Sequence, residues 1–263
     1  MIGGSRLTGF EAVARAVAGV PYMSPAQGRT VYEHVRATRP RDVLELGTAH
    51  GVGAAYLAAG LQANGAGHLT TVDHAGARYD PAPEVVLARA GVAAQVTVVR
   101  EFSSYTWWLK EQVRAGSDAA GNCRPRFDFV YLDGAKNWTI DGLAVLLVEK
   151  LLRPGGWLLL DDLDWTYADD PRREATDGIV HRELSEPERT EPHLRAVWEL
   201  LVAQHPAFTE LRVQDEWWAW ARKAPGEPRR LTLETSRPLG ALAAGALRRG
   251  LRRARRVRRS LSR

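Results

Sequence analysis

VLELGTAHGVG, residues 43–53, combines a short apolar run, a glycine turn and the start of a small-residue helix that we predict over 52–64. The apolar run, 43–46, is typical of a buried strand. Glycines at a strand-to-helix turn let a ligand approach the backbone closely. Tight packing would explain the same glycines equally well, and their spacing is not that of the dinucleotide-binding fingerprint.

Outward from this segment, short apolar runs alternate with amphipathic stretches. Strands are predicted at 43–46, 68–72, 95–99, 127–132, 157–160, 208–213 and 217–221, and helices at 7–18, 24–38, 52–64, 83–90, 104–115, 140–152 and 193–204. This alternation indicates a doubly wound, mainly parallel α/β sheet of seven strands with helices on both faces, a Rossmann-like fold. The last two strands are predicted to be antiparallel.

We expect three parts along the chain. Residues 1–40 would form N-terminal helices that act as a lid or interface, and 41–222 the α/β domain. A polar insertion, 164–192, interrupts this domain and is long enough to cover a substrate, although a solvated surface loop is the simpler alternative. Residues 223–263 would be a linker and an arginine-rich amphipathic tail.

In doubly wound sheets, ligands bind beyond the carboxyl ends of the strands. Asp73 ends the second strand, where it could bond a ribose diol or cap a helix. Asp133 and the pair Asp161-Asp162 follow two strands expected to be neighbours, so three carboxylates would converge. Such a cluster repels itself and raises its own pKa values, which a hard divalent cation such as Mg²⁺ would relieve. The alternative is that some of these aspartates cap helices or turns.

Five segments carry a resemblance to a known family. In chain order they are VLELGTAHGVG, TVDHA, VVREF, FDFVYLDGAK and LLRPGGWLLLDD. Over about residues 20–222 the chain resembles class I S-adenosylmethionine-dependent methyltransferases. Asp133-x-x-Lys136 and Asp161-Asp162 resemble the divalent-metal-dependent O-methyltransferases of the catechol and caffeoyl-CoA type. The family usually has Asp-Asn where this chain has Asp161-Asp162, and the Asp-Asp form resembles sugar and macrolide-sugar O-methyltransferases. The segment MSPAQG, residues 23–28, is similar to the corresponding segment of the bacterial members.

The resemblance implies a set of site residues. Those for S-adenosylmethionine are Glu45, Gly47, Thr48, Gly51, Asp73, Glu101, Phe102 and Asp133, with Phe102 standing where the family usually has glycine. Those for Mg²⁺ or another divalent cation are Asp133, Asp161 and Asp162. The metal would coordinate the acceptor hydroxyl, lower its pKa and fix its direction.

Lys136 or His181 would then take the hydroxyl proton. A lysine base needs a depressed pKa, which burial beside a cation would produce. The alternative for Lys136 is a solvated cation or a salt bridge to an acid. Trp165 and Tyr167, at the start of the polar insertion, would stack on the acceptor or pack at the sheet edge.

These inferences favour an Mg²⁺-assisted O-methyltransferase acting on a hydroxyl of a sugar, oligosaccharide or glycosylated natural product. The same chemistry on a catechol-like diol is the close alternative, favoured by Lys136. A nucleic-acid-binding or membrane-peripheral protein that acts through its tail is the alternative of another class. Trp107, Trp108, Trp217, Trp218 and Trp220 are expected as core or interface anchors, and a homodimer is expected.

Charge and cysteine content limit these alternatives. The net charge is +5 and the sequence pI about 9.6, but residues 248–263 hold nine arginines and no acid. Removing nine positive charges from +5 leaves −4 for 1–247, which argues against nucleic acid. Residues 247–261 form a basic amphipathic pattern that suits a disordered solubilising tail, an anchor to an anionic membrane surface, or a contact with nucleic acid or an acidic partner. One cysteine, Cys123, excludes a disulfide framework, and without an apolar span or signal we expect a cytoplasmic protein.

Overall fold

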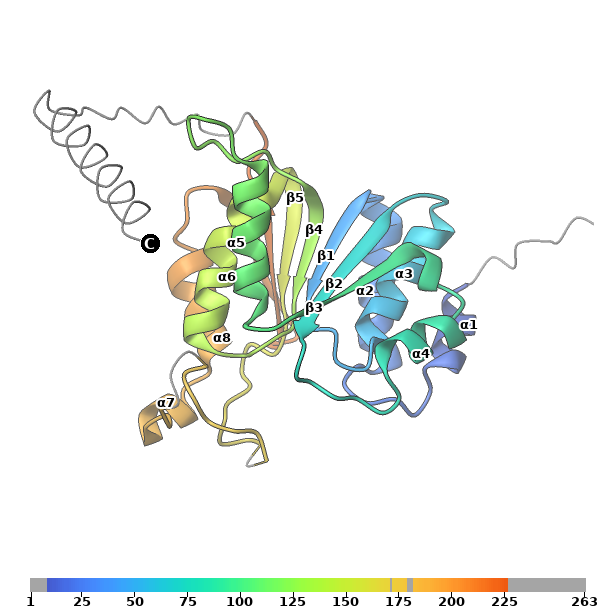
Figure 1. Cartoon of the computed structure of the whole chain (residues 1–263), viewed down its shortest axis with the longest axis horizontal. Helices are drawn as coiled ribbons and strands as arrows, with labels where there is room; N and C mark the ends of the chain where they lie inside the picture. The colour runs from blue at the N-terminus through green and yellow to red at the C-terminus, as the bar shows by residue number, and fades with distance from the viewer. Residues whose placement is uncertain (1–8, 171, 179–181, 227–263) are drawn as a thin grey trace, which may run out of the picture.

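The computed structural model describes residues 9–170, 172–178 and 182–226. A seven-stranded sheet in the order β3-β2-β1-β4-β5-β7-β6 runs through this part of the chain (Figure 1). Its strands are β1 Asp42–Leu46, β2 His68–His74, β3 Val96–Glu101, β4 Phe127–Leu132, β5 Leu152–Leu160, β6 Phe208–Gln214 and β7 Trp218–Lys223. Strands β1 to β5 pair in parallel, and β7 is antiparallel to both β5 and β6. The predicted doubly wound, mainly parallel α/β fold is confirmed.

Helices cover both faces of the sheet (Figure 1). On one face lie α1 Phe10–Ala16, α2 Pro25–Thr38, α3 Val52–Ala63, α4 Pro83–Arg89 and the short 3-10 helix η1 Ala93–Gln95. On the other lie α5 Tyr105–Gly116, α6 Trp138–Leu151, α8 His193–Ala196 and the π-helix η2 Val197–Val202. Each face buries its own apolar cluster, because alternate residues of each strand point to opposite faces.

Local sequence signals set several element ends. Ser24 caps α2 by accepting from the Gln27 N–H at 3.2 Å, while the Gln27 side chain accepts from the Ser24 N–H at 2.9 Å. Pro25 occupies the first helical turn, where its missing N–H costs nothing. The predicted helix 193–204 is instead a short α-helix that continues as a π-helix, and β5 starts at Leu152, five residues before the predicted strand.

The tryptophans divide between core and surface. Trp218 and Trp220 lie in the same buried cluster, as their alternate positions on β7 predict. Trp107 and Trp217 are 52% and 37% exposed, so the prediction that they are core residues is wrong. Their role as interface anchors, and the homodimer itself, stay predictions.

The carboxyl ends of the parallel strands meet at one edge of the sheet, at the bottom of Figure 1. The segment that follows β5, including α7 Glu186–Thr190, lies at this edge beside the loops that follow β1 and β2. Among the described residues, no helix is long and apolar enough to cross a membrane. His181 and the tail residues 247–261 lie outside the described residues.

Candidate active site

The turn after β1 is held in place by Asp73 at the end of β2. Asp73 Oδ2 accepts from the backbone N–H groups of Thr48 and Ala49, at 3.2 and 2.8 Å. Gly47 has φ 101°, and a Cβ there would lie 2.2 Å from the Asp133 carbonyl oxygen. Gly51, with φ 83°, begins α3. The turn therefore needs glycine at Gly47 for both its backbone angle and its packing against the loop after β4.

Glu45 lies directly beneath this turn and is 1% exposed. Its carboxylate accepts from the Thr71 hydroxyl at 2.5 Å, and the Thr48 and Thr71 hydroxyls are also 2.5 Å apart. Burial raises the pKa of Glu45 well above its ordinary value. The Thr48 hydroxyl is thus hydrogen-bonded within the core, while its backbone N–H donates to Asp73 and its carbonyl accepts from the Gly51 N–H.

A small hollow opens at the end of β1 between this turn and the segment before α2. Its lining includes Met23, Glu45, Gly47, His50 and Asp133. His50 is 8% exposed, and its Nδ1 lies 2.8 Å from the Pro81 carbonyl oxygen. Glu45, Gly47, Thr48 and Asp133, which the resemblance assigned to the cofactor, therefore line one hollow, with Gly51 in the same turn.

The residues expected near the adenine lie one strand further along the sheet. Glu101 ends β3 and pairs in register with His74 of β2. The Glu101 carboxylate accepts from the Phe102 N–H at 2.9 Å, whereas the Phe102 ring is 84% exposed. An exposed aromatic ring beside the β2 and β3 ends is available for stacking, and the adenine role of both residues stays a prediction.

Lys136 lies between two of the three predicted metal ligands. Its Nζ is 2.6 Å from Asp133 Oδ1 and also forms an ion pair with Asp162 Oδ2. Burial lowers the pKa of Lys136, but the charges of Asp133 and Asp162 outweigh burial and hold it above its ordinary value. The salt-bridge alternative describes this arrangement, in which the two carboxylates keep Lys136 protonated, and the role of Lys136 as a base beside a bound cation stays a prediction.

Asp161, the third predicted ligand, is tied into the core. It is 5% exposed, and one oxygen accepts from the Tyr131 hydroxyl. The other oxygen accepts from the Trp218 indole N–H and from the Asp162 N–H at 2.7 Å. Burial, followed by the charges of Asp133 and Asp162, raises the pKa of Asp161 well above its ordinary value. These bonds make Asp161 a structural acceptor.

The three carboxylates do not fit a magnesium site in this arrangement. Mg²⁺ needs carboxylate oxygens that are free to converge on it. Here an ammonium group bridges Asp133 and Asp162, and protein donors occupy Asp161. Within residues 9–170, 172–178 and 182–226, no three acidic, histidine or cysteine side chains are grouped as ligands.

A buried polar network fixes the loop that carries Lys136. The Tyr105 hydroxyl donates to Asp141 and accepts from the Ala135 N–H at 3.0 Å. Asp141, 0% exposed, also accepts from the Asn137 N–H at 2.7 Å, and the Asn137 side chain caps α6. The sequence interpretation missed Tyr105, Asp141 and Tyr131, although the spacing of Asn137 and Asp141 across a helix start is a usable signal.

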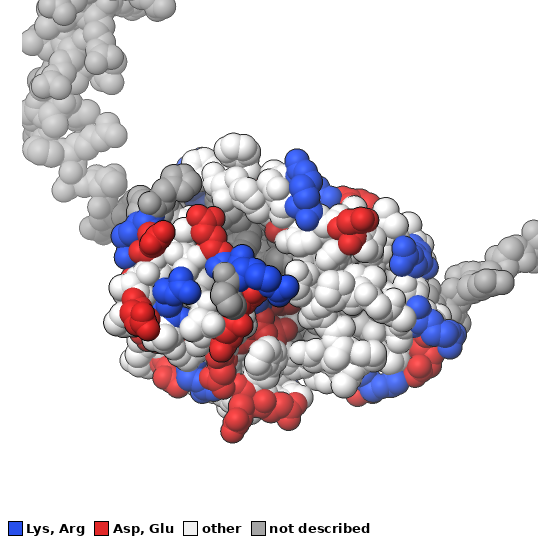
Figure 2. Space-filling model, turned by 90° about the horizontal axis from the view of Figure 1, so that it is seen from below, with Lys and Arg blue, Asp and Glu red and all other residues white. Residues whose placement is uncertain are grey.

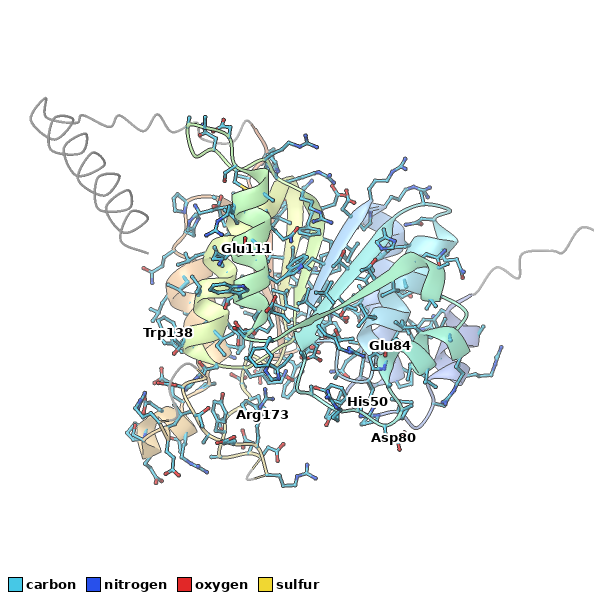
Figure 3. All side chains as sticks on the ribbon, in the orientation of Figure 1. His50, Asp80, Glu84, Glu111, Trp138 and Arg173 are labelled. Carbon is cyan, nitrogen blue, oxygen red and sulfur yellow. The ribbon has the colours of Figure 1, made fainter. Side chains whose placement is uncertain are left out.

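The segment after β5 closes over this loop. Arg173 donates to the carbonyl oxygens of Gly134 and Ala135 at 3.3 and 2.8 Å, and its guanidinium lies 5.0 Å from the Trp165 ring centre. Arg173 and His50 lie at the same edge of the molecule, from opposite sides of the sheet (Figure 3). Figure 2 looks onto this edge and shows acidic side chains gathered on the half that carries α7. Tyr167, 4% exposed, packs in a small cluster rather than facing an acceptor.

Comparisons with known proteins bear on the domain and its fold. Residues 44–163 match a family model described as a methyltransferase domain. No curated protein is similar enough to be matched.

Solved structures of similar fold include the O-methyltransferase TomG of Streptomyces achromogenes, involved in tomaymycin synthesis and solved with SAM. It is 21% identical, with a TM-score of 0.55, over 82% of this chain and 89% of TomG. A Bacillus cereus O-methyltransferase solved with SAH is 20% identical, with a TM-score of 0.54, over 81% of this chain and 90% of its own. The SAH-bound methyltransferase PaMTH1 of Podospora anserina is 17% identical, with a TM-score of 0.56, over 83% of this chain and 88% of PaMTH1. The family match over residues 44–163 and the sheet order show that the chain carries a methyltransferase domain.

Proposed function

We propose that this chain transfers the methyl group of S-adenosylmethionine to a hydroxyl oxygen. The observation that carries the proposal is that Asp133 joins two groups of residues, since it packs against Gly47 and also pairs with Lys136. The glycine turn pinned by Asp73 lies on one side of Asp133, and the Lys136–Asp162 ion pair lies on the other. The O-methyltransferases from Streptomyces achromogenes and Bacillus cereus support oxygen as the acceptor atom, since they share this fold.

We assign the methionine and ribose parts of the cofactor to the end of β1, on the residues that line its small hollow. Gly47 and the Gly51 turn allow close approach to backbone N–H groups. Asp73 accepts from the Thr48 and Ala49 N–H groups at Oδ2 and from the His74 N–H at Oδ1, so about one of the roughly four acceptor sites of its carboxylate is left for a ribose hydroxyl. When bound, the cofactor would supply a methyl group on a sulfonium, and its transfer to the acceptor oxygen would leave a neutral thioether while the hydroxyl proton passes to water.

For the acceptor we propose a sugar or another polyol. Asp133, Asp162 and Lys136 present charged hydrogen-bonding groups at the crevice, which suit neighbouring hydroxyls. Trp165 stays partly exposed beside Arg173 and offers a ring face to a sugar. A catechol-like diol would use the same groups, so it is the alternative outcome of the test.

A mass-shift screen tests this function. The full chain is incubated with S-adenosylmethionine and panels of oligosaccharides, glycosides and catechols, and each product is examined for the added methyl group and its position. We expect O-methylation of a glycoside or oligosaccharide, and none with Asp73→Asn as the matched inactive protein. Transfer to nitrogen or carbon acceptors alone would reject the proposal.

A further inference from the structure

The centre beside the cofactor hollow already contains a cation, and that cation belongs to the chain. The Lys136 side chain is 12% exposed, and its ammonium group contacts carboxylates from two different loops. Asp133 follows β4 and Asp162 follows β5, so the ammonium joins the two loops at the position expected for a divalent metal.

Charge balance at this position disfavours a second cation. Two carboxylates with one ammonium carry a net charge of −1, whereas the same carboxylates without Lys136 would carry −2. A divalent ion would have to lie beside the buried ammonium or displace it, and like charges at such separations repel strongly away from bulk water. Asp161 has little capacity left as a further ligand, because the Trp218 and Asp162 N–H groups donate to one of its oxygens and the Tyr131 hydroxyl to the other.

The backbone is shaped for the ion pair. Lys136 and Asp162 both have left-handed φ angles, 56° and 58°, which non-glycine residues adopt at a cost. Such conformations persist where the surroundings fix them. Around Lys136, the Tyr105 hydroxyl holds the Ala135 N–H and Arg173 holds the Ala135 carbonyl. The loop therefore presents the ammonium group from a fixed position.

We propose that the Lys136 ammonium takes the place of the divalent cation, so that this methyltransferase works without a metal and Lys136 holds the acceptor oxygen itself. An ammonium has three N–H donors. The described residues accept two of them, at Asp133 and Asp162, which leaves one for the acceptor. This inference rests on the proposed function for the acceptor contact, but its prediction about metal binding does not.

Manganese titration of the full chain, with free Mn²⁺ followed by electron paramagnetic resonance, tests the metal prediction directly. Wild-type protein stripped with a chelator should show no saturable Mn²⁺ site up to about 1 mM, the weak end of protein cation sites. Lys136→Met keeps side-chain length and removes the charge. It should gain a saturable site at least about tenfold tighter than any wild-type binding, because two carboxylates are left unneutralised.

Three further variants serve as controls. Lys136→Met combined with Asp162→Asn should lose the gained site. Lys136→Arg should keep the positive charge of the side chain and should therefore bind no Mn²⁺. Lys110→Met removes another lysine that is paired with a carboxylate, Glu111 at 2.6 Å, but on α5 away from the centre, and should gain nothing.

A saturable Mn²⁺ site in the wild type that Asp162→Asn abolishes would overturn the proposal, as would a Lys136→Met protein that folds and gains no site. If Lys136→Met does not fold, the wild-type and Asp162→Asn titrations still decide. SAH binding, measured on the same samples, distinguishes failure of the proposed function from failure of the metal prediction. The expected Mn²⁺ pattern without SAH binding would reject the methyltransferase function but would still support the replacement of the metal by Lys136. Once an acceptor is known, turnover unchanged by a chelator supports the proposal, and its loss contradicts it.

Discussion

Lys136 and Asp162 form an ion pair across two loops, and both residues have left-handed backbone conformations. The pair links the carboxyl ends of β4 and β5 next to the cofactor hollow. Because Asp133 Oδ1 is 2.6 Å from the same ammonium group, the loop after β4 and the loop after β5 share one charged centre. In the proposed function, the position of the acceptor oxygen depends on this pair as well as on the glycine turn after β1.

Asp162→Asn is expected to lower methyl transfer by at least about tenfold, because it removes the charge that orients the Lys136 ammonium. Affinity for SAH should change by less than about twofold, since Asp162 lies away from the glycine turn. Initial rates and calorimetric titrations measure the two effects. A large loss of SAH affinity would place Asp162 in the cofactor site instead. Asp161→Ala is a poorer probe, because it leaves the Tyr131 and Trp218 donors unpaired in the core.

Asp73→Asn should weaken SAH binding by at least about tenfold, because it replaces the carboxylate that accepts from Thr48 and Ala49 and that we propose as an acceptor for the ribose. Calorimetry on folded protein measures the change. Asp118→Asn is the matched control: Asp118 also pins a turn, accepting from the Ala120 and Asn122 N–H groups at 2.9 Å, but in the loop between α5 and β4. Equal losses in both variants would refute a specific role for Asp73.

Gly47→Ala should destabilise the fold by about 3 kcal/mol or more, because the new Cβ meets the Asp133 carbonyl at 2.2 Å and φ is 101°. Gly121→Ala separates the two causes. Gly121 has φ 86° and nothing within 4 Å of the position that a Cβ would occupy, so only the backbone cost of about 1 kcal/mol is expected. Urea unfolding measures the loss in the free energy of unfolding for both variants. Similar losses in the two would show that the contact with Asp133 is unimportant.

Tyr105→Phe is expected to cost about 2–3 kcal/mol, since it removes the hydroxyl that donates to buried Asp141 and accepts from Ala135. Tyr56→Phe provides the contrast. The Tyr56 hydroxyl is buried without a hydrogen-bond partner among the described residues, so its removal should be neutral or slightly stabilising. Denaturant unfolding of the two variants under identical conditions gives the difference, and a Tyr105 effect no larger than that of Tyr56 would count against the network.

His34 should make the fold sensitive to acid. Burial, and then the charge of Arg212, lowers the pKa of His34 to about 4 from 6.5, among the rings of Phe129, Trp157 and Trp220. Below pH 6.5 the unfolded chain binds a proton that the folded chain refuses until about pH 4, so stability falls as the pH falls through this window. The loss is about 3 kcal/mol in total. His34→Phe should flatten the unfolding free energy between pH 6.5 and 4 relative to wild type, and an unchanged slope would contradict this reason.

Local patterns predicted most of the fold. Alternating apolar runs placed β1, β2, β3 and β4 within one or two residues at most of their ends, and Ser24-Pro25 marked the start of α2. The pattern failed where long-range pairing decides the outcome. β5 extends back to Leu152 because Leu152 pairs with Phe127 across an irregularity, and no local signal in Pro154-Gly155-Gly156 reveals that pairing.

The candidate site was predictable in its members but not in their roles. Spacing and motif order selected Asp73, Asp133, Lys136 and the Asp161-Asp162 pair, which the structure places at one edge. The donor that occupies Asp161 comes from Trp218, 57 residues further along the chain. The Lys136–Asp162 contact depends on two left-handed residues. Neither property can be derived from the spacing of acidic residues, which is why the sequence favoured a magnesium ion where the chain has an ammonium group.

Calorimetric titration of the full chain with SAH tests most directly the central claim, that the crevice at the end of β1 binds the methyl donor. The hollow between the Gly47 turn, Glu45 and Asp133 predicts saturable binding of one SAH molecule per chain, strongly weakened by Asp73→Asn and retained in Asp118→Asn. Folded wild-type protein that shows no saturable SAH binding would contradict the assignment of this crevice to the methyl donor.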